Sequence, residues 1–157
     1  MKPRTTNFFC GCELSWTGKK GIVDFTKCEY EPRKNFNRAS RIEGKYIIPA
    51  ENSGWHLRCW QNDCKKDVTF NEMEGDLHNL QPSIGKVNGV RSNFRYSQFT
   101  SEFTQCGQCK SAVDFQTRKF QPHDEICGVI ARTYFYMSDK IQYQFLCFRT
   151  QTDDRME

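Results

Sequence analysis

The sequence lacks any hydrophobic run that could cross a membrane. Its longest apolar patches, such as the dipeptides Ile47-Ile48 and Phe145-Leu146, fall far short of the roughly 18 residues that a membrane-spanning helix needs. It also lacks internal repeats, low-complexity tracts and an apolar segment near its first residues, so we expect no signal peptide in this chain. The 157 residues are 37% hydrophobic and 14% aromatic. This composition excludes a wholly disordered chain and suffices for one compact domain.

Cysteine, by contrast, is abundant. Nine cysteines suit an oxidising compartment, which conflicts with the expected lack of a signal peptide. We expect that a leader has been removed or that the chain derives from a secreted ancestor and has lost it. Cys106 and Cys109 have the two-residue spacing of a redox or zinc half-site. Cys10 and Cys12 are one residue too close to supply a matching second pair, so a zinc site is disfavoured.

The charge is small and unevenly distributed. The net charge is +4, from 23 basic and 19 acidic residues. Residues 1–49 hold 10 Lys and Arg against 5 Asp and Glu, a net of +5, whereas the remaining residues hold 13 against 14. A basic half can indicate contact with a polyanion such as nucleic acid. A soluble surface with chance asymmetry explains the same numbers, so charge alone does not decide between the two.

The pattern of apolar and turn-forming residues predicts an α+β fold with loops pinned by cysteines. Short strands are predicted over residues 8–16, 21–25, 41–48 and 112–115. Helices are predicted over residues 68–80, 82–88 and 123–140. The last of these is the clearest, because Ile126, Val129, Ile130, Tyr134 and Met137 form one apolar face.

Five segments of the sequence carry a resemblance to known proteins. They are residues 10–12 (CGC) with 16–21 (WTGKKG), 37–43 (NRASRIE) with 47–50 (IIPA), 59–61 (CWQ), 73–85 (MEGDLHNLQPSIG) and 130–137 (IARTYFYM). In this order, and with similar spacing over residues 8–140, they resemble the bacterial endonuclease I family of periplasmic and secreted nucleases.

The resemblance implies a single endonuclease I-like domain over residues 1–157, with its C-terminal region truncated after about Tyr143. It implies a ββα-metal (His-Me finger) fold, in which two strands and a helix surround one divalent ion, usually Mg²⁺. The implied activity is hydrolysis of phosphodiester bonds of DNA, and possibly of RNA, with little sequence preference. The implied protein is a monomer without membrane contact, located in the periplasm or secreted.

Two positions depart from the family pattern where the chemistry takes place. Tyr46 stands at the position of the family's general-base histidine, and a phenol with a pKa of ~10 is a poor base at neutral pH. Lys45 stands at the position of the metal-binding carboxylate, and its ammonium repels a cation. An arginine that relatives carry between the positions of Cys59 and Cys64 has no counterpart. Nuclease activity is therefore expected to be impaired; the alternative is an inactive or truncated relative that at most binds nucleic acid.

The remaining candidate residues fall into three groups. The expected metal ligand is Asn88, with possible help from Glu43 and Glu74. Phosphate contacts are expected at Arg38, Arg41, Arg91, Lys19 and Lys20, although Arg38 and Arg91 could instead hold loops to helices. The resemblance implies disulfides among Cys10, Cys12, Cys28, Cys59, Cys64 and Cys109. His78 and His123 are interpreted as structural residues and His56 as a surface-loop residue. The alternative for His56 is that it replaces the missing general-base histidine.

Overall fold

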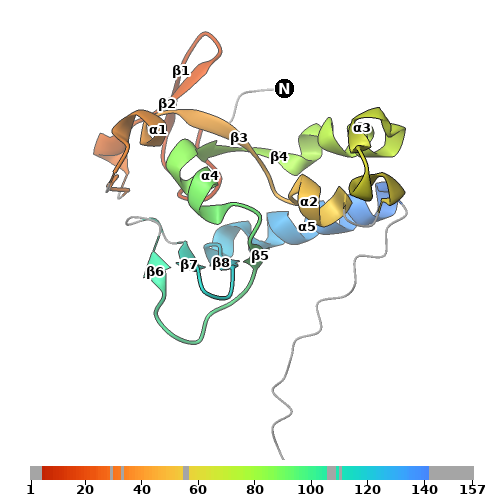
Figure 1. Ribbon diagram of the computed structural model, residues 1–157. Helices are drawn as coiled ribbons and strands as arrows, with labels where there is room; N and C mark the ends of the chain where they lie inside the picture. The colour runs from red at the N-terminus through yellow and green to blue at the C-terminus, as the bar shows by residue number, and fades with distance from the viewer. Residues whose placement is uncertain are drawn as a thin grey trace, which may run out of the picture.

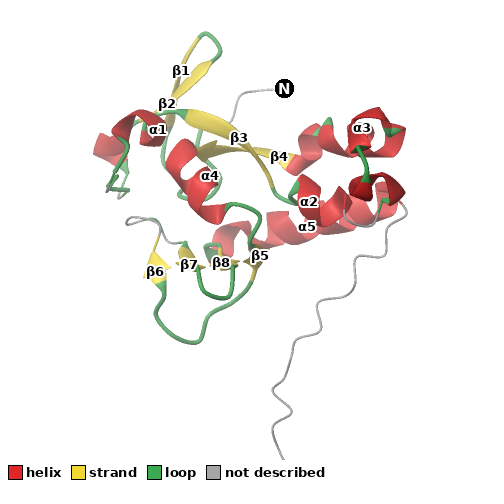
Figure 2. Cartoon of the chain, in the orientation of Figure 1, coloured by secondary structure: helices red, strands yellow, loops and turns green. Residues whose placement is uncertain are grey.

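The computed structural model describes residues 5–28, 30–32, 34–54, 57–105, 109 and 111–141. The strands are β1 Leu14–Thr17, β2 Lys20–Val23, β3 Ile42–Tyr46, β4 Leu80–Ile84, β5 Arg95–Tyr96, β6 Thr104–Gln105, β7 Ala112–Asp114 and β8 Lys119–Gln121. The helices are α1 Phe36–Ala39, α2 Ala50–Gly54, α3 Val68–Glu74, α4 Gly85–Arg91 and α5 Asp124–Ile141. Short 3-10 turns span Phe25–Lys27, Arg58–Gln61, Cys64–Lys66 and Leu77–Asn79. This mixture confirms the α+β class (Figure 2).

The described strands form three small sheets (Figure 1). β1 and β2 make an antiparallel hairpin, and β3 pairs antiparallel with β4, so that Lys45 lies opposite Gln81 and Tyr46 opposite Leu80. The third sheet has the order β5-β8-β7-β6, with β5 and β8 parallel. β4 runs directly into α4, so two strands and one helix form a continuous β3–β4–α4 unit. None of the described helices is both long and apolar enough to cross a membrane.

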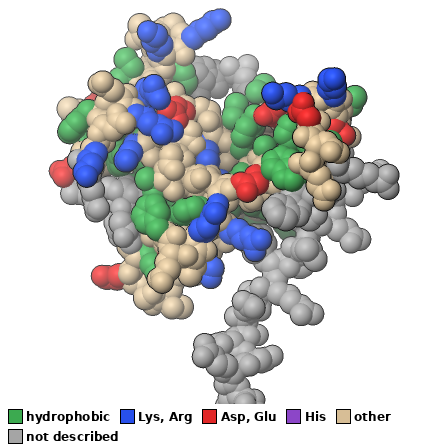
Figure 3. Space-filling view, in the orientation of Figure 1, with side chains coloured by type: hydrophobic (Ala, Val, Ile, Leu, Met, Phe, Trp, Pro, Cys, Tyr) green, Lys and Arg blue, Asp and Glu red, His purple; other side chains and the backbone are tan. Residues whose placement is uncertain are grey.

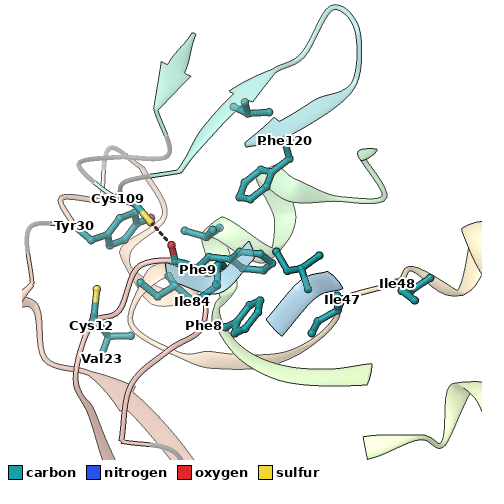
Figure 4. Packing of buried hydrophobic residues seen from close by; sticks show 14 of the residues in the cluster. Phe8, Phe9, Cys12, Val23, Tyr30, Ile47, Ile48, Ile84, Cys109 and Phe120 are labelled. Carbon is teal, nitrogen blue, oxygen red and sulfur yellow. Dashed lines mark hydrogen bonds between the residues drawn. The ribbon is translucent and has the colours of Figure 1, made fainter. Parts of the chain in front are cut away.

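A buried cluster of apolar side chains joins this unit to the rest of the protein (Figure 4). Phe9 and Phe120 pack edge to face with their ring centroids 5.2 Å apart, which ties the N-terminal segment to β8. Ile47 and Ile84 are fully buried where β3 ends and where β4 meets α4. Burial of side chains of this size contributes about 1.5–3 kcal/mol each. The core therefore holds β3, β4 and α4 firmly in place.

Three disulfides join the six cysteines that the resemblance singled out, whose partners the sequence left open. Cys10 pairs with Cys109, Cys12 with Cys28, and Cys59 with Cys64, with Cα–Cα distances of 4.9, 5.0 and 4.8 Å. Cys127 is a free thiol. The remaining two cysteines, Cys106 and Cys147, lie outside the described residues, and so does His56.

Two of the predicted helices differ from the structure. The helix predicted over residues 68–80 ends at Glu74, because the side chain of Asp76 accepts a hydrogen bond from the backbone N–H of His78 at 2.9 Å and starts a separate turn. The helix predicted over residues 82–88 begins only at Gly85, since Pro82 lies in β4 opposite Gly44. The strand predicted over residues 8–16 is confined to its end, from Leu14 onward. The helix predicted over residues 123–140 is confirmed as α5.

Candidate active site

Helix α4 packs closely against the segment that leads into β3, and two glycines make this approach possible. A Cβ atom on Gly85 would lie 2.6 Å from the carbonyl oxygen of Arg38 and 2.7 Å from Oε1 of Glu43. A Cβ on Gly89 would lie 3.0 Å from Nη1 of Arg38. Because neither glycine carries a side chain, the side chains of Arg38 and Glu43 fit directly against the face of the helix.

Glu43 is the centre of a polar group that we call the Glu43 cluster: Arg38, Arg41, Glu43 and Asn88. Its Oε2 accepts hydrogen bonds from Nη2 of Arg38 at 3.1 Å and from Nδ2 of Asn88 at 2.8 Å. Its Oε1 accepts from Nε of Arg38 at 3.2 Å and from Nε of Arg41 at 3.0 Å. Burial alone would raise the pKa of Glu43, but the hydrogen bonds from Arg38, Asn88 and Arg41 lower it below its ordinary value. Glu43 is therefore an ionised carboxylate surrounded by donors.

Lys45 and Arg91 converge on one backbone carbonyl. Nζ of Lys45 donates to the carbonyl oxygen of Ser92 at 2.5 Å, and Nη1 of Arg91 donates to the same oxygen at 2.8 Å. Burial, followed by the positive charge of Arg91, lowers the pKa of Lys45 to about 7. Arg91 is itself fully buried and also donates from Nη2 to the carbonyl oxygen of Ile47 at 2.8 Å. This is the loop-holding arrangement that the sequence left open for Arg91.

Tyr46 also points its polar atom at a backbone carbonyl. Its hydroxyl donates to the carbonyl oxygen of Glu74 at 2.8 Å. Burial, and then the charge of Glu74, raise its pKa above the ordinary value of 10.0. At neutral pH the hydroxyl is thus a hydrogen-bond donor that joins the end of β3 to the end of α3, and it is poorly suited to accept a proton.

The two carboxylate oxygens of Glu43 are not free to bind a divalent metal ion in this arrangement. Mg²⁺ requires oxygen ligands with free lone pairs, whereas both oxygens of Glu43 already accept hydrogen bonds from arginine or Asn88. Arg38, Arg41 and Lys45 add positive charge beside it. Within the described ranges, no group of three or more His, Cys, Asp or Glu side chains could hold a metal. The ligand roles of Asn88, Glu43 and Glu74 remain predictions.

The other candidate residues lie around this unit. Lys19 and Lys20 are exposed at the turn of the β1–β2 hairpin, and Figure 3 shows Lys and Arg side chains gathered over β1, β2 and α1. Nδ1 of His78 lies 3.1 Å from the buried carboxylate of Asp76, which also accepts from the hydroxyl of Tyr136 at 3.0 Å. This arrangement agrees with a structural role for His78.

Sequence reasoning missed the role of Asn79. Its side chain accepts from the backbone N–H of Ile48 at 2.8 Å and donates to the carbonyl oxygen of Ile48 at 2.9 Å. It thereby continues the pairing of β3 and β4 past Tyr46, and fixes the direction in which the chain leaves the site. Because the sequence placed Asn79 inside a helix predicted over residues 68–80, no local signal pointed to this role.

Comparisons with known proteins identify sequences similar to this chain. The family model described as Endonuclease I matches residues 1–156. The chain is 44% identical over 138 residues to Endonuclease-1 of Buchnera aphidicola subsp. Acyrthosiphon pisum, covering 85% of this chain and 55% of the relative. It is 44% identical over 140 residues to a Periplasmic deoxyribonuclease of Aeromonas hydrophila, covering 86% and 59%. An Extracellular deoxyribonuclease of the same species is 46% identical over 138 residues, covering 85% and 60%. The chain thus spans less than two thirds of these relatives.

Proposed function

Because the chain belongs to the endonuclease I family, we propose that it binds the phosphate backbone of DNA and hydrolyses phosphodiester bonds only weakly. The relatives named as deoxyribonucleases support DNA as the substrate class, with RNA as a further candidate. The side chains offered for backbone contact are Arg41, which is 62% exposed, Arg38, and the hairpin lysines Lys19 and Lys20. Contacts of this kind give affinity that falls with salt and carries no sequence information.

The contacts of Lys45 and Tyr46 are the observation that carries the weak-hydrolysis part of the proposal. Lys45 donates to the Ser92 carbonyl and Tyr46 donates to the Glu74 carbonyl, so each side chain holds the end of β3 to another segment of the backbone. General-base assistance typically contributes ~10²–10⁴ to a rate, and Tyr46, with a raised pKa, is unsuited to supply it near neutral pH. Lys45 replaces an expected carboxylate by a cation. The two losses need not add, because such groups act as a unit.

A fully active nuclease is the competing proposal. It is favoured by the 44–46% identity to relatives named as endonuclease and deoxyribonuclease. The three disulfides and the names of the periplasmic and extracellular relatives support action outside the cytoplasm under either proposal.

A plasmid-nicking assay separates the two proposals. Supercoiled DNA is incubated with the unmodified protein and with the double variant Lys45→Glu, Tyr46→His, each with Mg²⁺ and with EDTA. We expect little EDTA-sensitive nicking by the unmodified protein and a gain on the order of 10²-fold by the double variant. Lys65→Glu, an exposed charge reversal on a 3-10 turn, is the control and should gain nothing. Robust EDTA-sensitive nicking by the unmodified protein would replace the weak-hydrolysis proposal by the active one.

A further inference from the structure

We propose that the Glu43 cluster is an oxyanion-binding site that the chain fills with its own Glu43 carboxylate, and that a phosphate group of nucleic acid enters it by displacing that carboxylate. The inference rests on the proposed backbone binding for its natural ligand, and it deepens that function by assigning a phosphate-binding site and its internal competitor. It requires no metal ion and no chemical step.

The donors around Glu43 form a set that suits phosphate as well as carboxylate. Two guanidinium groups and one carboxamide converge on its two oxygens at donor–acceptor distances between 2.8 and 3.2 Å. Nε and Nη2 of Arg38 contact different oxygens of the carboxylate, which is the paired geometry by which arginine binds planar carboxylates and phosphates alike. The site is therefore already assembled around an anion.

The cluster is open on one side. The Glu43 side chain is 21% exposed and that of Arg38 38%, whereas that of Arg41 is 62% exposed. Gly85 and Gly89 close the opposite side through the backbone of α4, at distances that leave no room for a side chain. An incoming anion therefore meets Arg41 first, while Arg38 and Asn88 hold Glu43 from behind.

The charge of the cluster favours a second anion. Two guanidinium groups face one carboxylate, so the cluster keeps a net charge of +1, and Lys45 interacts electrostatically with both Glu43 and Arg38. In Figure 3, basic side chains also cover the neighbouring β1, β2 and α1. An isolated β-bridge between Ile22 and Arg41 joins the β1–β2 hairpin to the segment that precedes β3. Glu43 thus limits, but does not cancel, the attraction of this surface for phosphate.

The test compares two substitutions that change the net charge equally. Glu43→Gln removes the internal anion and frees Arg38 and Arg41, whereas Glu72→Gln removes an exposed carboxylate on α3. Binding of a DNA duplex is measured by fluorescence anisotropy over a range of salt concentrations. We expect Glu43→Gln to bind roughly threefold to tenfold more tightly, with a salt dependence steeper by about one to two units. Glu72→Gln should keep the slope of the unmodified protein.

Further measurements distinguish failure of the oxyanion site from misfolding of the variant and from failure of the proposed function. The melting temperature is recorded with and without inorganic phosphate, which we expect to stabilise Glu43→Gln and not the unmodified protein. If Glu43→Gln does not fold, Glu43→Asp, which withdraws the carboxylate by one methylene, should change binding in the same direction by less. Adding Arg41→Gln to either variant should abolish the gain.

The outcomes are distinguishable. Phosphate stabilisation of Glu43→Gln without DNA binding by any variant supports the oxyanion site and overturns the backbone-binding function. DNA binding in which Glu43→Gln and Glu72→Gln behave alike, without phosphate stabilisation, overturns the oxyanion site and leaves the function standing. Weaker DNA binding by a folded Glu43→Gln variant also overturns the site, because it would make Glu43 a support for the arginines rather than their competitor.

Discussion

The two ends of β3 use their polar side chains in different ways. At the start of the strand, Glu43 bonds to other side chains, namely those of Arg38, Arg41 and Asn88. At its end, Lys45 and Tyr46 bond to backbone carbonyls of Ser92 and Glu74. A hydrogen bond between two side chains can be replaced by a bond to a ligand, whereas a hydrogen bond to a backbone carbonyl fixes the position of one chain segment relative to another. One strand of five residues therefore carries a surface suited to binding at one end and a structural junction at the other.

The largest expected effect tests the junction at the end of the strand. Arg91→Met removes hydrogen bonds to the Ser92 and Ile47 carbonyls and a cation–π contact with the ring of Tyr96 at 4.7 Å. We expect the free energy of unfolding to fall by about 3 kcal/mol, since hydrogen bonds to charged groups contribute about 1.5–3 kcal/mol each and removal of a buried charge offsets part of the loss. Urea denaturation measures it. The control is Arg95→Met, because the Arg95 side chain is exposed. A change below about 0.5 kcal/mol would mean that Arg91 does not hold the junction.

A smaller effect, dependent on pH, is expected for Lys45. Burial lowers its pKa from 10.5 to about 7 in the folded state, so below pH 7 both the folded and the unfolded chain carry the proton and the fold bears a buried charge. As pH rises from about 7 to 10.5, the folded chain loses this proton first, and its stability increases.

Lys45→Met removes this cost of burying charge. It should therefore raise the melting temperature more at about pH 6 than at about pH 9.5. Differential scanning calorimetry at both pH values measures the difference, with Lys65→Met as the exposed control. An equal change at both pH values would contradict a depressed Lys45 pKa.

The smallest effect is expected for the Tyr46 hydroxyl. Tyr46→Phe removes its hydrogen bond to the Glu74 carbonyl and should lower the free energy of unfolding by about 0.5–1.5 kcal/mol. If the hydroxyl is structural, DNA affinity and nicking rate stay as they are in the unmodified protein. A loss of nicking without a loss of stability would instead assign the hydroxyl to catalysis and remove the contrast between the two ends of β3.

The sequence predicted elements where local signals were strong. The apolar face from Ile126 to Met137 predicted α5, and the resemblance implied the six paired cysteines. The helix predicted over residues 68–80 extended too far because apolar spacing continued past Gly75, while the Asp76 side chain ends it by a local hydrogen bond. β5, β6 and β8 are two or three residues long and are too short to show alternation.

The candidate site was predicted by position but not by contact. The resemblance singled out Glu43, Lys45, Tyr46 and Asn88, and β3, β4 and α4 bring these positions into one unit. The hydrogen-bond partner of Lys45 is Ser92, 47 residues away, and the partner of Glu43 most distant in sequence is Asn88, 45 residues away. Such pairings depend on strand register and on the close approach of α4 at Gly85 and Gly89, which no local pattern encodes.

The disulfide between Cys10 and Cys109 closes a covalent loop in the chain. The bridge spans a sequence separation of 99 residues, and β3, β4 and α4 all lie within the loop that it closes. A protease that cuts this loop once leaves both new ends attached to the same molecule through the bridge. Proteolytic nicking at a single exposed turn of this loop would therefore release no fragment, and β3, β4 and α4 would remain in one covalently connected molecule until the bridge was reduced.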